Sequence, residues 1–307
     1  MSRAAGDPLY RDPDLARFYD LDNGWGEDTR AAAELARDAT SVLDIGCGTG
    51  LLARHLAAGG RRVVGVDPAG AMLQIARAAP GGDAVAWVEA DAAGLDLGER
   101  FDLVVMTGHA FQVFLTAGER RAALRTVARH LAPEGRFVLD SRNPARAEWR
   151  GWTPEATREV LAHPELGPVE RWNDVAEDRD TGIITYTTAY RIAGAPPLTA
   201  QSRIAVASHD EIAAALAEAG LAAEFWWGGW DRRPSRRMRP RSLPSAGTFA
   251  GNPGHAFGLD RIRRLGQEGH SPLEARHDQP HLPYRDRREG SGPADARDRT
   301  GTPRGGL

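Results

Sequence analysis

The chain has 307 residues, a formal net charge of −3 and one cysteine, Cys47. A single cysteine excludes an internal disulfide framework, and no apolar run approaches the roughly 20 residues that a membrane-spanning helix needs. The first residues, MSRAAGDP, lack the apolar stretch of a secretory signal. We therefore expect a cytoplasmic protein without a membrane partner, long enough to bury a sizeable core.

The run 42–50, VLDIGCGTG, is the most informative motif in the chain. It begins like a buried parallel strand, and residues 51–56 (LLARHL) continue it with helical spacing. Asp44 precedes the turn between them, where a carboxylate would repel a pyrophosphate but suits the amino group of an amino-acid moiety. A tight turn and close approach to a ligand are permitted by the three glycines Gly46, Gly48 and Gly50.

Two further strand patterns each end near an acidic residue. Residues 62–67 (RVVGVD) predict a second strand ending in Asp67, about 20 residues after the first turn, the spacing at which ribose hydroxyls are bound. Residues 84–92 predict a third strand whose Asp91 is placed to accept from an adenine amino group. Met72, at the start of the intervening helix, offers the same ring a polarizable surface.

Two more strands are predicted at 101–106 (FDLVVM) and at 131–140, the latter entered through the turn LAPEG. The series resembles the class I S-adenosylmethionine-dependent methyltransferases over roughly residues 15–234, and more closely a small bacterial branch of mostly unassigned substrate. The resemblance to this branch rests on YDLDN (19–23), TGHAFQ (107–112) and SRNP (141–144).

This resemblance implies an α/β fold with a Rossmann-like doubly wound sheet, in the strand order 3-2-1-4-5-7-6, and S-adenosyl-L-methionine as cofactor. It implies cofactor contacts for Asp44, on the methionine amino group through water or backbone, for Asp67 on the ribose and for Asp91 on adenine. The full cofactor-binding set that we expect is Asp44, Gly46, Cys47, Gly48, Gly50, Asp67, Pro68, Met72, Asp91, Ala92 and Gly108.

The segment after the fifth strand is predicted to carry specificity. Residues 168–175, 182–192 and 200–207 have β-like patterns, which indicate a small antiparallel insert within about 150–207, over the carboxyl ends of the central strands. Ser208 is expected to cap a helix that Gly220 ends, and residues 221–227 to form strand six.

His109 is the candidate catalytic residue, because it follows the fourth strand beside the expected position of the methyl group. It could act as a general base or substrate hydrogen-bond donor, or it could only bond within the strand end. Gln112 could orient the substrate or cap the turn, and Arg142 could receive an anionic substrate group or pair with Asp140. Tyr19 and Trp25 could fold over the cofactor as an N-terminal lid or serve as core anchors.

The composition changes after residue 234. Residues 235–307 contain 14 arginines, eight acidic residues and no valine, which predicts a disordered tail. The family places a last strand just after residue 231, but residues 233–241 (RPSRRMRPR) are too charged and too rich in proline for a central strand. We therefore expect that strand to be missing. A reading-frame slip over 235–307 is one hypothesis that explains both observations.

The function that these patterns favour is methyl transfer from S-adenosylmethionine to an O, N or C nucleophile of a small molecule. Two alternatives remain at this point: a cofactor-binding protein with impaired catalysis and, less favoured, an NAD(P)-dependent oxidoreductase. We expect no metal, and no nucleic-acid partner, since acids are interspersed among the tail arginines and no Asn/Asp-Pro-Pro-Tyr-type sequence follows 101–106. The oligomeric state is left open.

Overall fold

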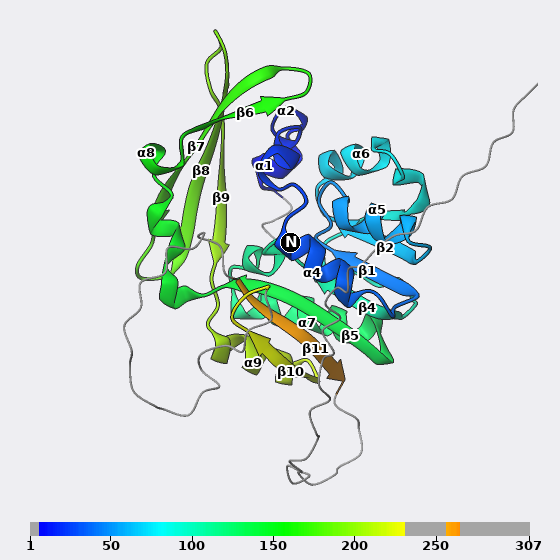
Figure 1. Ribbon diagram of the computed structural model, residues 1–307. Coiled ribbons are helices and arrows are strands. Elements are labelled where there is room, and N and C mark those ends of the chain that lie inside the picture. Colours follow the sequence, from blue (N-terminus) through cyan, green and yellow to red (C-terminus); the bar gives the residue numbers. More distant parts are fainter. Residues whose placement is uncertain (1–5, 231–255, 265–307) are drawn as a thin grey trace, which may run out of the picture. The chain divides into compact units, whose positions relative to one another are not determined.

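The computed structural model describes residues 6–230 with their side chains and residues 256–264 by their backbone. A seven-stranded sheet occupies its centre, in the order β10-β11-β5-β4-β1-β2-β3 (Figure 1). When the order is read from β3, and β10 and β11 are counted as the sixth and seventh strands of the family, it is 3-2-1-4-5-7-6. The predicted strand order is therefore confirmed. The strands are β1 (Ser41–Ile45), β2 (Arg62–Asp67), β3 (Ala86–Glu89), β4 (Phe101–Met106), β5 (Leu131–Arg142), β10 (Leu221–Trp227) and β11 (Ala256–Arg264).

Helices cover both faces of this sheet, which explains why its parallel strands are almost continuously apolar. One face packs against α4 (Glu27–Leu35) and α5 (Leu51–Ala58), and the other against α7 (Ala117–His130) and α9 (His209–Glu218). Helix α9 begins with the predicted cap, in which the Ser208 side chain accepts from the backbone N–H of Glu211. The remaining long helix is α6 (Gly70–Ala78), which follows β2.

The prediction that the last strand is missing is wrong. Strand β11, from residues 256–264, lies between β5 and β10 and pairs antiparallel with both. The prolines of 233–241 make that segment unsuitable, whereas AFGLDRIRR at 256–264 contains none and can supply ladder N–H groups. The disorder expected for residues 235–307 is thus overturned for 256–264. The other residues of 235–307 lie outside the described part of the chain, so the prediction of disorder is not tested there, and the reading-frame hypothesis is also untested.

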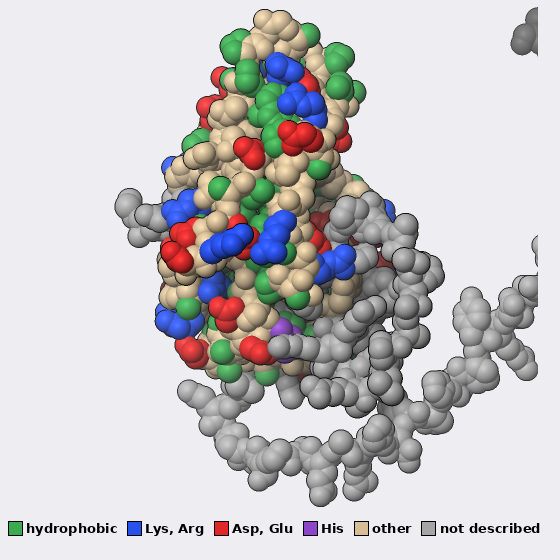
Figure 2. Space-filling model, turned by 90° about the vertical axis from the view of Figure 1, so that its left-hand side faces the viewer, with side chains coloured by type: hydrophobic (Ala, Val, Ile, Leu, Met, Phe, Trp, Pro, Cys, Tyr) green, Lys and Arg blue, Asp and Glu red, His purple; other side chains and the backbone are tan. Residues whose placement is uncertain are grey.

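A second sheet forms the insert, as an antiparallel meander in the order β6-β7-β8-β9. Its first strand was not predicted. Side chains alternate between its two faces, so that the inner face buries Asn173, Thr188 and Ser202 while the outer face carries Glu170 and Arg191. Figure 2 shows acidic and basic side chains interspersed on this side of the molecule. The strands are β6 (Glu159–His163), β7 (Gly167–Glu177), β8 (Ile183–Ile192) and β9 (Leu198–Ala205).

Short helical segments connect these elements. Figure 1 shows α1 and α2 between the insert strands and α6, and both helices contact β9 and α6. No helix in the described ranges is long and apolar enough to cross a bilayer. The short segments are α1 (Pro8–Arg11), α2 (Pro13–Ala16), α3 (Tyr19–Asp22), η2 (Gly82–Ala84), η3 (Ala110–Val113), η4 (Pro144–Arg146), η5 (Glu148–Gly151) and α8 (Pro154–Thr157).

Candidate functional site

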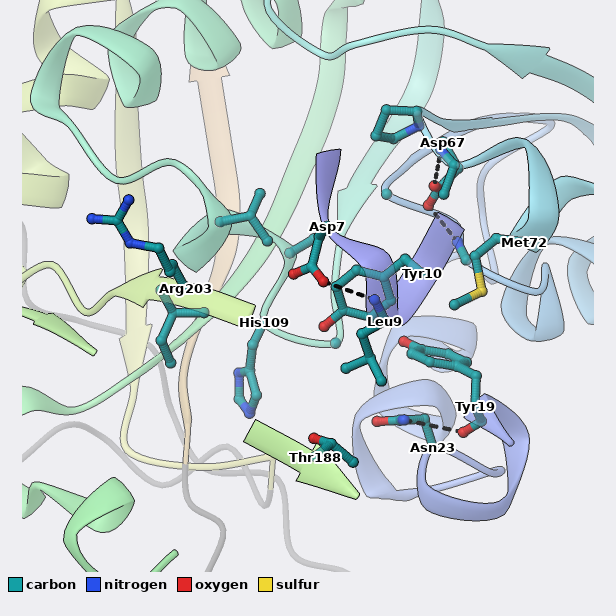
Figure 3. Close-up of a pocket in the computed structure, with 18 of the residues that line it drawn as sticks. Asp7, Leu9, Tyr10, Tyr19, Asn23, Asp67, Met72, His109, Thr188 and Arg203 are labelled. Carbon is teal, nitrogen blue, oxygen red and sulfur yellow. Dashed lines mark hydrogen bonds between the residues drawn. The ribbon is translucent and has the colours of Figure 1, made fainter. Parts of the chain in front are cut away.

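A cavity of about 640 Å³ opens at the carboxyl ends of the central strands (Figure 3). Its walls come from the ends of β1, β2, β4 and β5, from the N-terminal segment and from the inner face of the insert. Parallel strands present their carboxyl ends at one edge, which is where open α/β sheets bind ligands. The predicted residues that line the cavity are Tyr19, Gly46, Gly48, Asp67, Pro68, Met72, Asp91, Ala92, Gly108, His109 and Arg142.

The glycine turn after β1 has the backbone conformation that its composition predicts. Gly46, Gly48 and Gly50 have φ angles of 78°, 54° and 75°, in the left-handed region that L side chains rarely adopt. A Cβ atom at Gly46 would lie 2.8 Å from the Cβ of Ala110, and one at Gly48 would lie 3.4 Å from Cε1 of Tyr19. Both positions line the cavity, so the turn leaves room for a ligand where side chains would fill it.

Asp67 ends β2 with both carboxylate oxygens held by backbone donors. Gly48 N–H donates to Oδ2 at 2.9 Å, and Ala69 N–H donates to Oδ1 at 2.8 Å. Burial raises the pKa of this carboxyl, although the two backbone hydrogen bonds oppose that effect. The side chain is therefore locked at the cavity wall, with lone pairs left to accept from a bound diol.

Asp91 lies in the loop after β3, because that strand ends at Glu89 rather than continuing to residue 92. Its Oδ1 accepts from the backbone N–H of Ala93 at 2.8 Å. Its Oδ2 is buried and has no hydrogen-bond partner in the described part of the chain. An unpartnered buried acceptor at a cavity wall suits a ligand that donates a hydrogen bond, such as an adenine amino group.

Three of the predicted cofactor residues lie behind the cavity wall. Asp44 is 3% exposed, and its burial, together with the nearby charge of Asp67, raises its pKa to about 7. Burial also raises the pKa of the Cys47 thiol. A Cβ atom at Gly50 would lie 2.2 Å from the Trp87 ring, so this glycine is needed for packing. None of the three lines the cavity, and contact of Asp44 with a ligand through water or backbone remains a prediction.

The N-terminal segment closes one side of the cavity with tyrosines. Tyr19 packs over Gly48, and its ring meets that of Tyr10 edge to face, with 6.0 Å between centroids. The hydroxyl of Tyr10 lies 3.0 Å from that of Tyr186 on β8, which links the segment to the insert. Trp25 is placed elsewhere: it is 39% exposed, its ring contacts that of His55 in a tilted arrangement with 4.4 Å between centroids, and it does not line the cavity.

His109 stands at the cavity wall just after β4, against a buried aspartate. Its φ of 62° is unusual for a residue other than glycine. Its backbone N–H donates to both oxygens of Asp140, at 3.0 and 3.2 Å, and its Nδ1 lies 2.6 Å from Oδ2 of Asp140. This last contact is short, although the ring is not aligned for a straight hydrogen bond. Asp140 is fully buried near the end of β5, where it accepts from the backbone of His109 and contacts one ring nitrogen.

Gln112 and Arg142 form a second unit beside this pair. Gln112 is fully buried and does not line the cavity; its Oε1 accepts from Nη1 of Arg142 at 3.0 Å. The guanidinium carbon of Arg142 lies 4.9 Å from the ring centroid of Trp152. The alternative pairing of Arg142 with Asp140 is not formed, because Asp140 contacts His109 instead.

The insert was predicted to lie over the site, but the insert residues that line the cavity were not named, and the contribution of the first helix was missed. The insert's inner face could have been proposed from its alternation of side chains, but the sequence does not show which face turns toward the central sheet. Among the cavity residues that were not predicted are Asp7, Tyr10, Trp152, Arg171, Asn173, Tyr186 and Thr188.

The known proteins that this chain resembles are methyltransferases. Residues 42–135 match a family described as "Methyltransferase domain". The chain is 30% identical over 263 residues to dTDP-3-amino-3,6-dideoxy-alpha-D-glucopyranose N,N-dimethyltransferase of Streptomyces fradiae, which covers 80% of this chain and 96% of that protein. It is 31% identical over 199 residues to the cypemycin N-terminal methyltransferase of a Streptomyces species, covering 63% of this chain and 79% of the relative.

The chain belongs to the class I S-adenosylmethionine-dependent methyltransferases. The structure of the CcbJ methyltransferase from Streptomyces caelestis, 22% identical, has the same fold, with a TM-score of 0.63 over 86% of this chain and 98% of that one. The enzyme transfers a methyl group from S-adenosylmethionine to a small-molecule acceptor, and this membership excludes the NAD(P)-dependent oxidoreductase. The cavity fits the cofactor: the Gly46–Gly48 turn gives it room, Asp67 suits its ribose and the unpartnered Oδ2 of Asp91 suits its adenine.

Proposed function

We propose that this methyltransferase acts on an amino nitrogen of its small-molecule acceptor, and that His109 removes the proton from that nitrogen. The observation that carries this proposal is the contact between His109 and the buried Asp140 at the cavity wall. A carboxylate at Nδ1 favours the tautomer that carries its proton there. The other ring nitrogen, Nε2, is then a free acceptor.

The bound cofactor supplies an electrophilic methyl group on a sulfonium, which needs an acceptor with a lone pair. A protonated amine has no lone pair, so an amine acceptor requires a base near it. Nε2 of His109 is suited to take that proton, and the Asp140 carboxylate would stabilise the charge on the ring. An alternative role for His109, as a hydrogen-bond donor to the substrate, needs a proton on Nε2 before the reaction begins.

The relatives support transfer to nitrogen. The Streptomyces fradiae protein is named as an N,N-dimethyltransferase of an amino sugar nucleotide, and the Streptomyces protein as a methyltransferase of a peptide N-terminus. Ubiquinone biosynthesis O-methyltransferases also match, over 32% to 52% of this chain. The N-methyltransferases match over more of the chain, 63% to 80% of it.

The first test compares His109→Ala with the wild type. We expect turnover to fall about 10²–10⁴-fold, because a positioned general base contributes roughly that much. The dissociation constant for S-adenosylmethionine, measured by calorimetry, should change by no more than a few-fold. Methyl transfer is measured with dTDP-3-amino-3,6-dideoxyglucose and a peptide with a free N-terminus as acceptors. Added imidazole should restore part of the activity of the variant.

Asp140→Asn tests the orientation of the ring. An asparagine keeps the size of the side chain but can present its N–H₂ to Nδ1, which favours the wrong tautomer. We expect turnover to fall while cofactor binding is kept. Equal losses of turnover and cofactor affinity in both variants would instead give His109 a structural role. Cofactor binding without transfer to any amine would support the impaired binding protein.

A further inference from the structure

Arg142 is a positive charge in the cavity wall without a negative partner. It ends β5, lines the cavity and is only partly exposed. Burial lowers the pKa of its guanidinium. Within the described ranges, no carboxylate lies within 4.0 Å of it, and its Nη1 donates to the neutral Oε1 of Gln112. Burying a guanidinium without a counter-charge is costly, so the site favours an anion.

Another arginine in the same cavity shows the contrast. Arg171 on β7 lies 3.2 Å from Oδ1 of Asp22 and 3.2 Å from Oε1 of Glu159. Its charge is therefore neutralised within the protein. Arg142 has neutral neighbours instead, an amide oxygen at 3.0 Å and the face of Trp152 at 4.9 Å. These contacts fix the direction of the guanidinium but leave its charge available to a ligand.

The remaining surroundings of Arg142 are compatible with an anion. The paired hydroxyls of Tyr10 and Tyr186 are close enough to influence it, and burial raises the pKa of both phenols, so they stay neutral. One hydroxyl of the pair donates to the other, which leaves one O–H of the pair to donate elsewhere. The two nearby carboxylates have other partners: Asp140 contacts His109, and Glu148 pairs with Arg146 at 3.1 Å. The site therefore offers a fixed guanidinium and a phenolic hydroxyl.

The position of Arg142 relates it to the proposed base. Strands β4 and β5 are paired neighbours, with Met106 opposite Leu139. His109 and Arg142 each lie three residues beyond these partners. Adjacent strands are about 5 Å apart, so one small molecule can reach both side chains.

We propose that Arg142 binds an anionic group, a carboxylate or a phosphate, on the same molecule that carries the methylated amine. The inference rests on the proposed function for the amine, but the anion site itself does not depend on methyl transfer. It narrows the acceptor class from amines in general to amines that carry a negative charge, such as amino acids or amino sugar phosphates.

The test measures binding to the full chain saturated with S-adenosylhomocysteine, so no turnover is required. Two matched pairs of probes distinguish the anion: glycine with glycinamide for a carboxylate, and dTDP with thymidine for a phosphate. We expect the wild type to bind the member of one pair that carries the anionic group at least about tenfold more tightly than the member that lacks it. That preference should disappear in Arg142→Gln and persist in part in Arg142→Lys.

Arg203→Gln is the matched control, because Arg203 also borders the cavity but is exposed on β9. This variant should keep the preference for the probe that carries the anionic group. Unchanged binding of S-adenosylhomocysteine in all variants shows that the cofactor half is intact. Equal preference in the wild type and Arg142→Gln, or no preference in the wild type for either pair, would overturn the proposal. If the enzyme methylates amines but binds both members of each probe pair equally well, only the anion site is refuted. If it binds the anionic probes but methylates no amine, only the proposed function is refuted.

Discussion

The carboxyl group of Asp44 is enclosed behind the glycine turn, and this enclosure has a consequence for stability. Burial, and then the charge of Asp67, raise its pKa from 3.8 to about 7. The folded state therefore holds the proton more tightly than the unfolded state. Between pH 3.8 and about 7 the unfolded chain ionises first, so this group lowers the free energy of unfolding as the pH rises. Below and above that window its contribution is constant.

Asp44→Asn removes this titration while keeping the size of the side chain. We expect the free energy of unfolding of the cofactor-free wild type, relative to the variant, to fall by up to about 4 kcal/mol from pH 4 to pH 8, at about 1.4 kcal/mol per unit of pKa. Urea unfolding of both proteins across this range measures the difference. Two parallel pH curves would show that Asp44 titrates normally in the folded protein.

The strand–turn–helix element after β1 depends on a glycine for packing as well as for conformation. Gly50 precedes α5 with a φ of 75°, and its missing side chain leaves space for Trp87 of β3. The indole Nε1 of Trp87 donates to the carbonyl oxygen of Gly82 at 2.7 Å, so the ring cannot easily move away. The turn thus connects β1 to α5 and packs both against β3.

Gly50→Ala should destabilise the protein by about 2–5 kcal/mol, because the strain of a positive φ adds to a steric clash. Gly81→Ala is the matched control: Gly81 has a φ of 79°, but a Cβ atom there would meet nothing within 4 Å. That variant should lose only about 1–2 kcal/mol. Thermal and urea unfolding of both variants separate the two effects. If both variants lose the same free energy of unfolding, the Trp87 ring moves aside without an energetic cost.

At the scale of the whole protein, the central sheet is completed by a strand that lies outside residues 15–234, the range over which the sequence resembles a methyltransferase. That strand is β11, from residues 256–264. Strand β11 connects β5 to β10, and without it these strands would have no hydrogen-bonded neighbour on their facing sides. Unpaired strand edges are destabilising and promote aggregation. The strand belongs to the same compact unit as the other described residues.

Two truncations test this arrangement. A chain ending at residue 234 lacks β11, and we expect it to unfold at a lower urea concentration than the full chain and to aggregate. A chain ending at residue 266 keeps every described residue and should match the full chain in stability. If both truncated chains are as stable as the full protein, β11 contributes nothing to the fold. Sequencing the locus again would test the reading-frame hypothesis directly.

The position of the expected cofactor residues at one cavity could be predicted because their signals are local. The glycine turn, Asp67 and Asp91 each lie at or just after the end of a strand, and parallel strands bring their carboxyl ends to one edge whatever the rest of the chain does. The same local patterns predicted α9 with its cap and three of the four insert strands, and the sheet order followed from the family resemblance that the motifs carry.

The acceptor half depends on contacts between residues far apart in the chain. His109 and Asp140 are 31 positions apart, and Tyr10 and Tyr186 are 176 apart. No sequence pattern predicts that Asp140 contacts His109 and not Arg142, or that residues 256–264 form β11. Those outcomes follow from packing and from the need of the buried Asp140 carboxylate and of the strand edges for partners, which only the assembled chain supplies.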